Sequence, residues 1–212
     1  MSKGQQREME EYRYAAKIYD PLLFPFIRSI RNKVIKLVKQ YHYQSILDVC
    51  CGTGDQLKLL KQQGFDGEGI DISEAMLNVA RNGKIRADCK HQDATQMHYK
   101  EAKFELVMTA FSLHEKHHEA ARKIVEEMLR VTAGGGDILI VDYELSEKTS
   151  IFSKKLIYFI EWIAGGEHYQ NFKAYIDKGG LPALLSGITL KEVQRHYFGK
   201  NGIVLLLLRK EK

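Results

Sequence analysis

Short apolar runs alternate with amphipathic segments between residues 45 and 143. The apolar runs predict strands over residues 45–49, 66–70, 85–91, 104–109 and 136–143. The segments between them carry apolar residues at helical spacing and predict helices over residues 56–63, 74–82 and 117–131. Alternation of this kind predicts an α/β fold, in which helices cover both faces of a mostly parallel sheet.

The C-terminal part of the chain breaks this alternation. Residues 189–210 contain a strand pattern, a Gly-Lys-Asn-Gly turn and a second, strongly apolar strand pattern, which together predict a hairpin. We therefore expect the last strand to run antiparallel to its neighbours. Two other segments are candidates for substrate-facing additions: a basic amphipathic helix over residues 25–41 and an apolar, aromatic-rich region over residues 151–185.

Two interpretations are open for each of these additions. The basic helix either packs on the domain with its charges in water, as most amphipathic helices do, or lies on an anionic membrane. The aromatic-rich region has too many apolar side chains for one exposed helix. It therefore either packs on the sheet or covers an apolar substrate.

Length and composition narrow the class of protein. The chain has 212 residues and is 44% hydrophobic, enough for one substantial core, and a domain averages roughly 150 residues. The first residues are too charged for a secretory signal, and the apolar runs are far shorter than the roughly 20 residues that a membrane span needs. We expect a single cytoplasmic domain.

Cysteine spacing and charge exclude further classes. The three cysteines, Cys50, Cys51 and Cys89, show no CxxC spacing and predict neither a disulfide nor a structural metal. The net charge of +5 is modest. No basic patch interleaved with stacking aromatics stands out, so we expect no nucleic-acid partner.

The stretch SILDVCCGTGD, residues 45–55, predicts a sharp turn from a strand into a helix. Gly52 and Gly54 allow a ligand to approach the backbone closely. Asp71 ends the next predicted strand at the same edge of the sheet, where a carboxylate can accept both hydroxyl protons of a ribose. The pattern indicates an adenosine pocket rather than a dinucleotide site, because Leu57 stands where a third glycine is needed. A glycine turn without a ligand is the plainer alternative.

Four motifs in order resemble those of class I S-adenosylmethionine-dependent methyltransferases: LDVCCGTGD, GIDISEAMLNVAR, QDATQMHY and FELVMTAFSLHE. The chain is most similar to the small-molecule, type 11 like branch that includes ubiquinone and menaquinone biosynthesis methyltransferases. This resemblance implies a Rossmann-like, doubly wound sheet of seven strands, mostly parallel with an antiparallel last strand. It also implies four parts of one domain: an N-terminal helical cap (1–44), a cofactor-binding core (45–146), a helical substrate-side insertion (147–186) and a closing hairpin (187–212).

The resemblance implies S-adenosylmethionine as the cofactor, with its methionine end near the glycine turn. Tyr19 would close over this end, and Asp48 would fix the loop or bind the amino group. Ala110 and Phe111 would line the sulfonium. The loop residues implied to hold the amino-acid part are Cys50, Gly52, Thr53 and Gly54.

The same resemblance places the adenosine along the next two strands. Asp71 would bind the ribose, and Ile72 and Met76 would flank the adenine with apolar surface. Asp93 and the backbone of Ala94 would meet the exocyclic amine and a ring nitrogen. Met76 fits a simple core position equally well, because it lies at helical spacing on an amphipathic segment.

His114 is the candidate general base, because it follows the fourth predicted strand beside the implied methyl position. Glu115 is the candidate for orienting it. The alternative is that His114, His117 and His118 form an exposed helix start. We predict no metal here, because no carboxylate or cysteine partner is evident in the sequence.

The expected reaction is direct, in-line methyl transfer with S-adenosylhomocysteine as by-product. The expected acceptor is small and apolar or amphipathic, such as a quinol precursor or a lipid head group, and peripheral contact with membrane lipid would suit it. The sequence leaves open whether carbon, oxygen or nitrogen is methylated. It also leaves open whether the protein is a monomer or a homodimer. The alternatives are a non-catalytic, cofactor-binding regulatory subunit and, less favoured, an RNA or protein methyltransferase.

Overall fold

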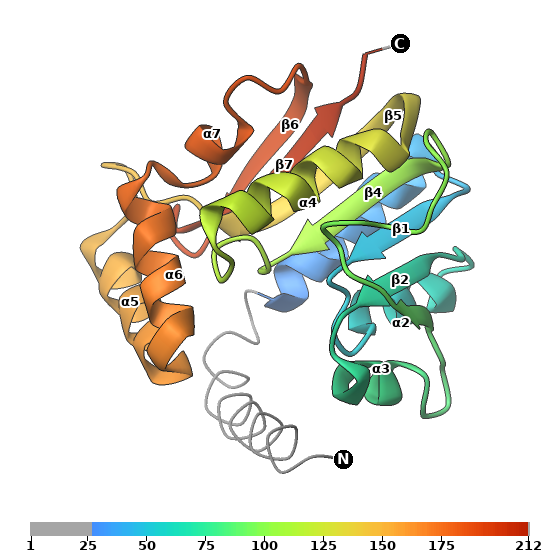
Figure 1. Ribbon diagram of the computed structural model, residues 1–212, viewed down its shortest axis with the longest axis horizontal. Coiled ribbons are helices and arrows are strands. Elements are labelled where there is room, and N and C mark those ends of the chain that lie inside the picture. The colour runs from blue at the N-terminus through green and yellow to red at the C-terminus, as the bar shows by residue number, and fades with distance from the viewer. Residues whose placement is uncertain (1–26, 212) are drawn as a thin grey trace.

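A seven-stranded sheet runs through the computed structural model, which describes residues 27–211 (Figure 1). Its order is β3-β2-β1-β4-β5-β7-β6. The strands are β1 (Ile46–Val49), β2 (Glu68–Asp71), β3 (Asp88–His91), β4 (Phe104–Ala110), β5 (Thr132–Tyr143), β6 (Lys191–Phe198) and β7 (Ile203–Arg209).

Strands β1 to β5 pair in parallel, and β7 pairs antiparallel with both β5 and β6. The predicted α/β fold and its antiparallel last strand are therefore confirmed. Strands β1 and β4 are neighbours in the sheet. From β1 the chain continues to β2 and β3 on one side, and from β4 it continues to β5 on the other side, so the strand order reverses between them. Open α/β sheets bind ligands outside the carboxyl ends of the strands at such a switch point.

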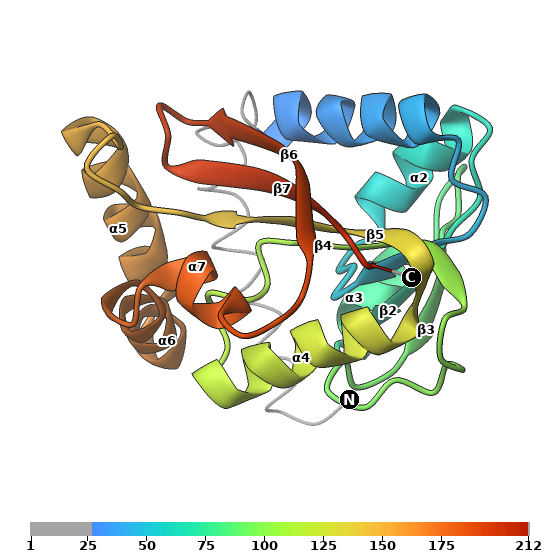
Figure 2. The same ribbon diagram turned by 90° about the horizontal axis from the view of Figure 1, so that it is seen from above.

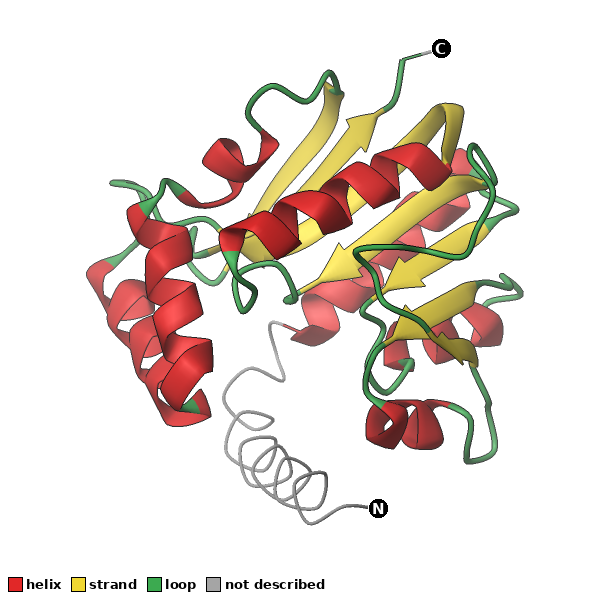
Figure 3. Ribbon diagram, in the orientation of Figure 1, coloured by secondary structure: helices red, strands yellow, loops and turns green. Residues whose placement is uncertain are grey.

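Helices cover both faces of the sheet (Figure 2). The helix over residues 27–41 lies on one face, and α4 lies on the other (Figure 2). Helices α5 and α6 lie beyond the carboxyl ends of β4 and β5 (Figure 3). The remaining bounds are α2 (Asp55–Gln62), α3 (Glu74–Ala80), α4 (His118–Val131), α5 (Ile151–Ala164), α6 (Gly166–Asp177) and α7 (Gly180–Leu185).

The basic N-terminal helix packs on the domain. Ile30, Val34, Leu37 and Val38 are buried in the core, while Arg28 and Lys36 point to solvent. Its apolar side is therefore used inside the domain, as expected for an ordinary amphipathic helix. None of the helices in residues 27–211 combines the length and the apolar character that crossing a membrane requires.

The aromatic-rich region forms three helices rather than one. Positive φ angles at Gly165 (89°) and Gly179 (101°) separate α5 from α6 and α6 from α7. Glycine adopts this conformation without the steric cost that a side chain would add. The chain can therefore fold back on itself, and α6 packs against both α5 and α7.

A buried carboxylate joins the last strand to the rest of the fold. Asp137 on β5 accepts hydrogen bonds from Nε and Nη2 of Arg209 on β7, at 2.8 and 2.7 Å, and from the hydroxyl of Tyr43. The Asp137 side chain is 1% exposed. This contact holds β7, β5 and the segment before β1 together.

Candidate functional site

The turn between β1 and α2 has an unusual backbone. Cys50, Gly52 and Gly54 have φ angles of 57°, 53° and 67°. A residue with a side chain pays roughly 1–2 kcal/mol for the left-handed conformation, so the strain at Cys50 is maintained by the surrounding structure. Strain of this kind concentrates at ligand sites.

Gly52 and Gly54 have different roles. A Cβ atom added at Gly52 would meet nothing within 4 Å, so this position faces open space. A Cβ atom at Gly54 would lie 2.8 Å from Cβ of Ala87 and 3.0 Å from Cβ of Ala80. Only Gly52 therefore leaves room for a ligand, whereas Gly54 is small because the loop packs on α3 and the start of β3.

The carboxylate of Asp71 lies beside this turn. Its Oδ2 accepts the backbone N–H of Gly52 and its Oδ1 accepts that of Ser73, each at 2.8 Å. An ionised carboxylate offers about four acceptor positions, so two remain for the hydroxyls of a ribose. Ile72 is 63% exposed next to it and provides an apolar surface, and Met76 is half-buried.

Asp93 lies on the same edge of the sheet. The register pairs Asp71 with His91, two residues before Asp93. Oδ1 of Asp93 accepts the backbone N–H and the hydroxyl of Thr95, and these bonds, the backbone one first, lower the pKa of Asp93. Its Oδ2 is left for another donor, and Ala94 beside it is buried. The residues predicted for the adenosine are therefore neighbours in space.

A cavity of about 160 Å³ lies between the glycine turn, the carboxyl end of β4 and the N-terminal helix. Five of the predicted site residues line it: Asp48, Cys50, Thr53, Ala110 and Phe111. Complete small-molecule pockets measure roughly 300–1,000 Å³, so this cavity matches one end of a nucleotide-like ligand rather than the whole.

Asp48 provides a negative group inside this cavity. It is buried, and within residues 27–211 its carboxylate forms no hydrogen bond. Burial first, and the neighbouring charge of Asp71 second, raise the pKa of Asp48 to about 7, although Arg31 acts in the opposite direction. A buried carboxyl group of this kind gains most from a cation, such as the ammonium group of an amino acid.

Two polar side chains that sequence reasoning missed complete the cavity. Nε2 of Gln56 is buried and has no hydrogen-bond partner among the described residues. Arg31 lines the same cavity and lies 3.2 Å from Asp55. Both can donate to a ligand carboxylate. Gln56 was detectable as the start of the helix after the glycine turn, whereas Arg31 looked like an ordinary surface residue.

The cysteines around the turn are free thiols. Burial raises the pKa of Cys50 to about 12, so its unreactive thiol form prevails near neutral pH. Cys51 and Cys89 both pack against Gly69, where an added Cβ would come within 2.8 Å of each sulfur. These side chains fill space beneath the turn.

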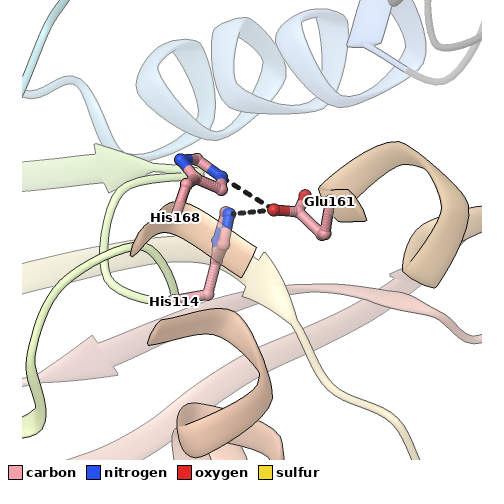
Figure 4. A group of neighbouring side chains, drawn as sticks. All are labelled: His114, Glu161 and His168. Carbon is pink, nitrogen blue, oxygen red and sulfur yellow. Dashed lines mark hydrogen bonds and ion pairs between the residues drawn. The ribbon is translucent and has the colours of Figure 1, made fainter. Parts of the chain in front are cut away.

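His114 lies in a separate, buried cluster (Figure 4). Its Nδ1 is 2.6 Å from Oδ1 of Asp142, and its Nε2 is 3.6 Å from Oε2 of Glu161. Burial alone would lower the pKa of His114, but the two carboxylates outweigh it and raise the pKa to about 10. The ring of Tyr143 contacts His114 at 4.6 Å and Phe111 at 5.8 Å between centroids, and so connects this cluster to the cavity.

The structure corrects two expectations about His114. It does not belong to an exposed helix start; His117 is the exposed residue there. Its orienting carboxylate is Asp142 rather than Glu115, which lies 3.4 Å from Nδ1 of His168 instead. Sequence reasoning missed this pairing because the residues come from separate elements of the fold.

Helix α5 both packs and remains exposed. Ile157 and Ile160 are buried, while Phe152 and Trp162 are 68% and 62% exposed. Phe159 is also exposed and stacks on Trp162 with ring centroids 6.2 Å apart. The outer face of α5 is therefore aromatic and open to a further molecule.

The structure thus brings most of the predicted site residues to the carboxyl edge of the parallel strands. Gly54 faces the interior rather than the ligand space, and His114 lies apart from the cavity. Tyr19 lies outside the described residues.

Residues 46–136 match the family described as a methyltransferase domain. The fold is similar to that of magnesium protoporphyrin IX methyltransferase from Synechocystis PCC 6803, solved with bound SAH (S-adenosylhomocysteine). The TM-score is 0.67 and the identity 15%, over 96% of this chain and 94% of that one. The family match is therefore confined to residues 46–136, and the likeness to the solved methyltransferase shows a shared fold.

Its curated relatives include demethylmenaquinone methyltransferases. The chain is 31% identical to that of Oceanobacillus iheyensis over 140 residues, covering 62% of this chain and 57% of the relative. It is 34% identical to that of Halalkalibacterium halodurans over 141 residues, covering 62% and 56%. The chain therefore matches little more than half the length of these relatives.

Proposed function

We propose that the protein transfers a methyl group from S-adenosylmethionine to a small apolar or amphipathic acceptor. The observation that carries this proposal is the cavity beside Gly52, where the buried carboxyl group of Asp48 and the unpartnered amide of Gln56 face the same space. An amino acid presents one cation and one anion, which these two groups complement.

The bound cofactor supplies an electrophilic methyl group on a sulfonium. Asp48 would bind the ammonium group, Gln56 would donate to the carboxylate, and Asp71 would accept the ribose hydroxyls. Ala110 and Phe111 line the cavity and would form the wall on the side of the methyl group. These residues would orient the methyl group, and their apolar neighbours would exclude water, so that orientation would supply most of the rate enhancement.

An apolar, quinol-like acceptor is the first class to test. The relatives named demethylmenaquinone methyltransferase favour it. The aromatic outer face of α5, formed by Phe152, Phe159 and Trp162, offers a surface of matching character. Lipid head groups are the second class, because an aromatic face can also meet the boundary of a lipid surface.

The role of His114 as a general base stays a prediction. Asp142 holds its Nδ1, and a pKa of about 10 keeps the ring protonated near neutral pH, so Nε2 could accept a proton from the acceptor only after releasing its own. His114→Ala would remove the imidazole that pairs with the buried carboxylates of Asp142 and Glu161 and would destabilise the fold. His114→Asn keeps a donor for Asp142, and a loss of turnover with unchanged cofactor affinity would support the role.

Cofactor binding is the first test. We expect calorimetric titration to show binding of S-adenosylmethionine and S-adenosylhomocysteine and none of NADH. Asp71→Ala should weaken binding at least about tenfold, because the ribose loses a charged acceptor worth about 1.5–3 kcal/mol. Asp66→Ala removes an exposed carboxylate and is the matched control. Preference for NADH, or equal binding by Asp71→Ala, would overturn the assignment.

Acceptor transfer is the second test. Short-chain quinols and phospholipid vesicles are incubated with methyl-labelled cofactor, and products are identified by mass spectrometry. We expect Trp162→Ser to raise KM for the acceptor several-fold with little change in kcat, and Val79→Ser, an exposed apolar position on α3, to have no effect. Cofactor binding without transfer to any acceptor would favour the non-catalytic alternative.

A further inference from the structure

Three side chains of the buried cluster converge from different elements. His114 lies on the segment between β4 and α4, Glu161 on α5 and His168 on α6 (Figure 4). One ligand atom from each of the three lies within 4.8 Å of the others. Two imidazoles and one carboxylate form a set of nitrogen and oxygen ligands that suits a divalent transition metal.

Both histidines are oriented for this purpose. Asp142 lies 2.6 Å from Nδ1 of His114, and Glu115 lies 3.4 Å from Nδ1 of His168. Carboxylates in these positions fix the ring and leave the other nitrogen free for a metal, as in the carboxylate–histidine–metal arrangement. In both rings that other nitrogen, Nε2, is the one directed at Glu161.

The spacing is close to that of a metal centre. Ligand atoms bound tetrahedrally at roughly 2.0–2.2 Å lie about 3.3–3.6 Å from each other. Nε2 of His114 lies 3.6 Å from Oε2 of Glu161, which meets this requirement. Nε2 of His168 lies 2.7 Å from the same oxygen and would need to open by roughly 0.6–0.9 Å.

The environment favours a cation and allows it to enter. Glu161 and His114 have side chains only 4% and 3% exposed, so the buried carboxylate of Glu161 is stabilised by a cation, which is the protonated ring of His114 when no metal is bound and the ion when one is. The side chain of His168 is 30% exposed and opens the cluster to solvent. An ion bound by three protein ligands would keep a further position for water or another oxygen ligand.

We propose that His114, Glu161 and His168 bind one divalent transition-metal ion, and Zn²⁺ is the ion with which we test the site. The sequence predicted no metal because no carboxylate or cysteine partner for His114 was evident in it; the fold supplies Glu161 from α5. An ion here would fasten α5 and α6 to the segment that follows β4. An ion on Nε2 excludes general-base action by that nitrogen, so the experiment below also decides between the two roles of His114.

The test uses untagged, full-length protein freed of metal with a chelator. Co²⁺ is titrated first, because its visible absorption reports coordination directly, and Zn²⁺ binding is then measured by calorimetry. We expect one equivalent to bind and to raise Tm. His168→Ala and Glu161→Gln should each lower the affinity about 100-fold or more, since even loss of a supporting carboxylate costs roughly 10–100-fold.

His117→Ala is the matched control, because His117 is an exposed histidine whose ionic partner within residues 27–211 is Glu167. It should bind Zn²⁺ as the original chain does. His168→Ala is the safer of the two ligand variants, since its side chain is partly exposed, and circular dichroism checks its fold. No binding to the original chain, or equal binding by His168→Ala, would overturn the proposal. Neither measurement uses S-adenosylmethionine. A failure of the metal proposal can therefore be distinguished from a failure of the proposed methyl transfer.

Discussion

At the scale of single residues, similar neighbours in the chain perform different tasks. Gly52 and Gly54 stand two positions apart, and both have left-handed backbones. Only the space around each glycine distinguishes them, because an added Cβ at Gly52 would meet no atom within 4 Å, whereas one at Gly54 would meet Ala80 and Ala87. The same holds for acids: Asp48 is buried at the cavity, whereas Asp71 is held by two backbone donors.

The two glycines give a paired prediction. Gly52→Ala should cost only about 1–2 kcal/mol of stability, from backbone strain, but abolish most cofactor affinity because its methyl group enters the ligand space. Gly54→Ala should cost more stability, since it adds strain to contacts with Ala80 and Ala87. Thermal unfolding and calorimetry separate the effects. Equal losses of affinity and of Tm in both variants would contradict this division.

Asp48 gives a prediction about pH. Its pKa of about 7 in the fold lies above the ordinary value of 3.8, so its stabilising contribution is full below pH 3.8 and is lost as pH rises toward 7. Asp48→Asn should therefore raise Tm of the ligand-free protein at pH 8 and leave it nearly unchanged at pH 4. The measurement is thermal unfolding across this range.

The same residue controls binding. Because the ionised form of Asp48 attracts the ammonium group, affinity for S-adenosylhomocysteine should increase as pH rises from 6 to 8 through the pKa of about 7. In Asp48→Asn the affinity should be lower and lose this dependence. A pH profile that is the same in both proteins would exclude Asp48 from the cofactor site.

At the scale of elements, long-range contacts place the helices and the last strand. Gly165 and Gly179 allow α5, α6 and α7 to fold back on one another. Asp137 and Arg209 fasten β7 to β5. The apolar pattern of β7 predicts a strand, but the ion pair adds a charged contact that fits only this register, in which Asp137 faces Arg209.

This ion pair gives a prediction for the closing strand. Arg209→Met should destabilise the protein by about 3–5 kcal/mol, because Asp137 would remain buried without its cation. Adding Asp137→Asn should recover a large part of the loss, since the uncompensated charge is removed. Denaturant unfolding of both variants measures this. No recovery in the double variant would show that the loss comes from packing by the arginine stem.

At the scale of the whole molecule, the cavity proposed to bind the cofactor joins three separate parts of the chain. The N-terminal helix contributes Arg31, β1 and α2 on either side of the glycine turn contribute Asp48 and Gln56, and β4 contributes Ala110. A ligand that contacts all three at once binds the folded chain and not the unfolded one. Binding should therefore stabilise the entire domain.

S-adenosylhomocysteine at about 100 times its Kd should raise the free energy of unfolding by about 2.7 kcal/mol. For a chain of this size the increase corresponds to a Tm shift of roughly 5–11 °C. Differential scanning fluorimetry measures the shift, with Asp71→Ala as the variant expected to show little of it at the same concentration. An unchanged Tm in the original protein would contradict binding at this site.

The sequence by itself determined the alternating fold, the glycine turn, and Asp71 and Asp93 at one edge. Each follows from local patterns, because neighbouring parallel strands end at the same side of the sheet. It also located the last strand. It misjudged the start of β5, read from residue 136, because the glycine-rich segment from Thr132 has low strand propensity and becomes part of the sheet through long-range contacts with Phe104 of β4 and with Lys210 after β7.

Only the tertiary structure decided the division between Gly52 and Gly54, the presence of Arg31 in the cavity, and the partners of His114. That histidine is contacted by residues from three other elements: Asp142 on β5, Glu161 on α5 and His168 on α6. Their spacing along the chain does not predict that they lie together. The physical reason is that local patterns specify which segments become helices or strands. Which side chains share a buried space depends on how those segments pack.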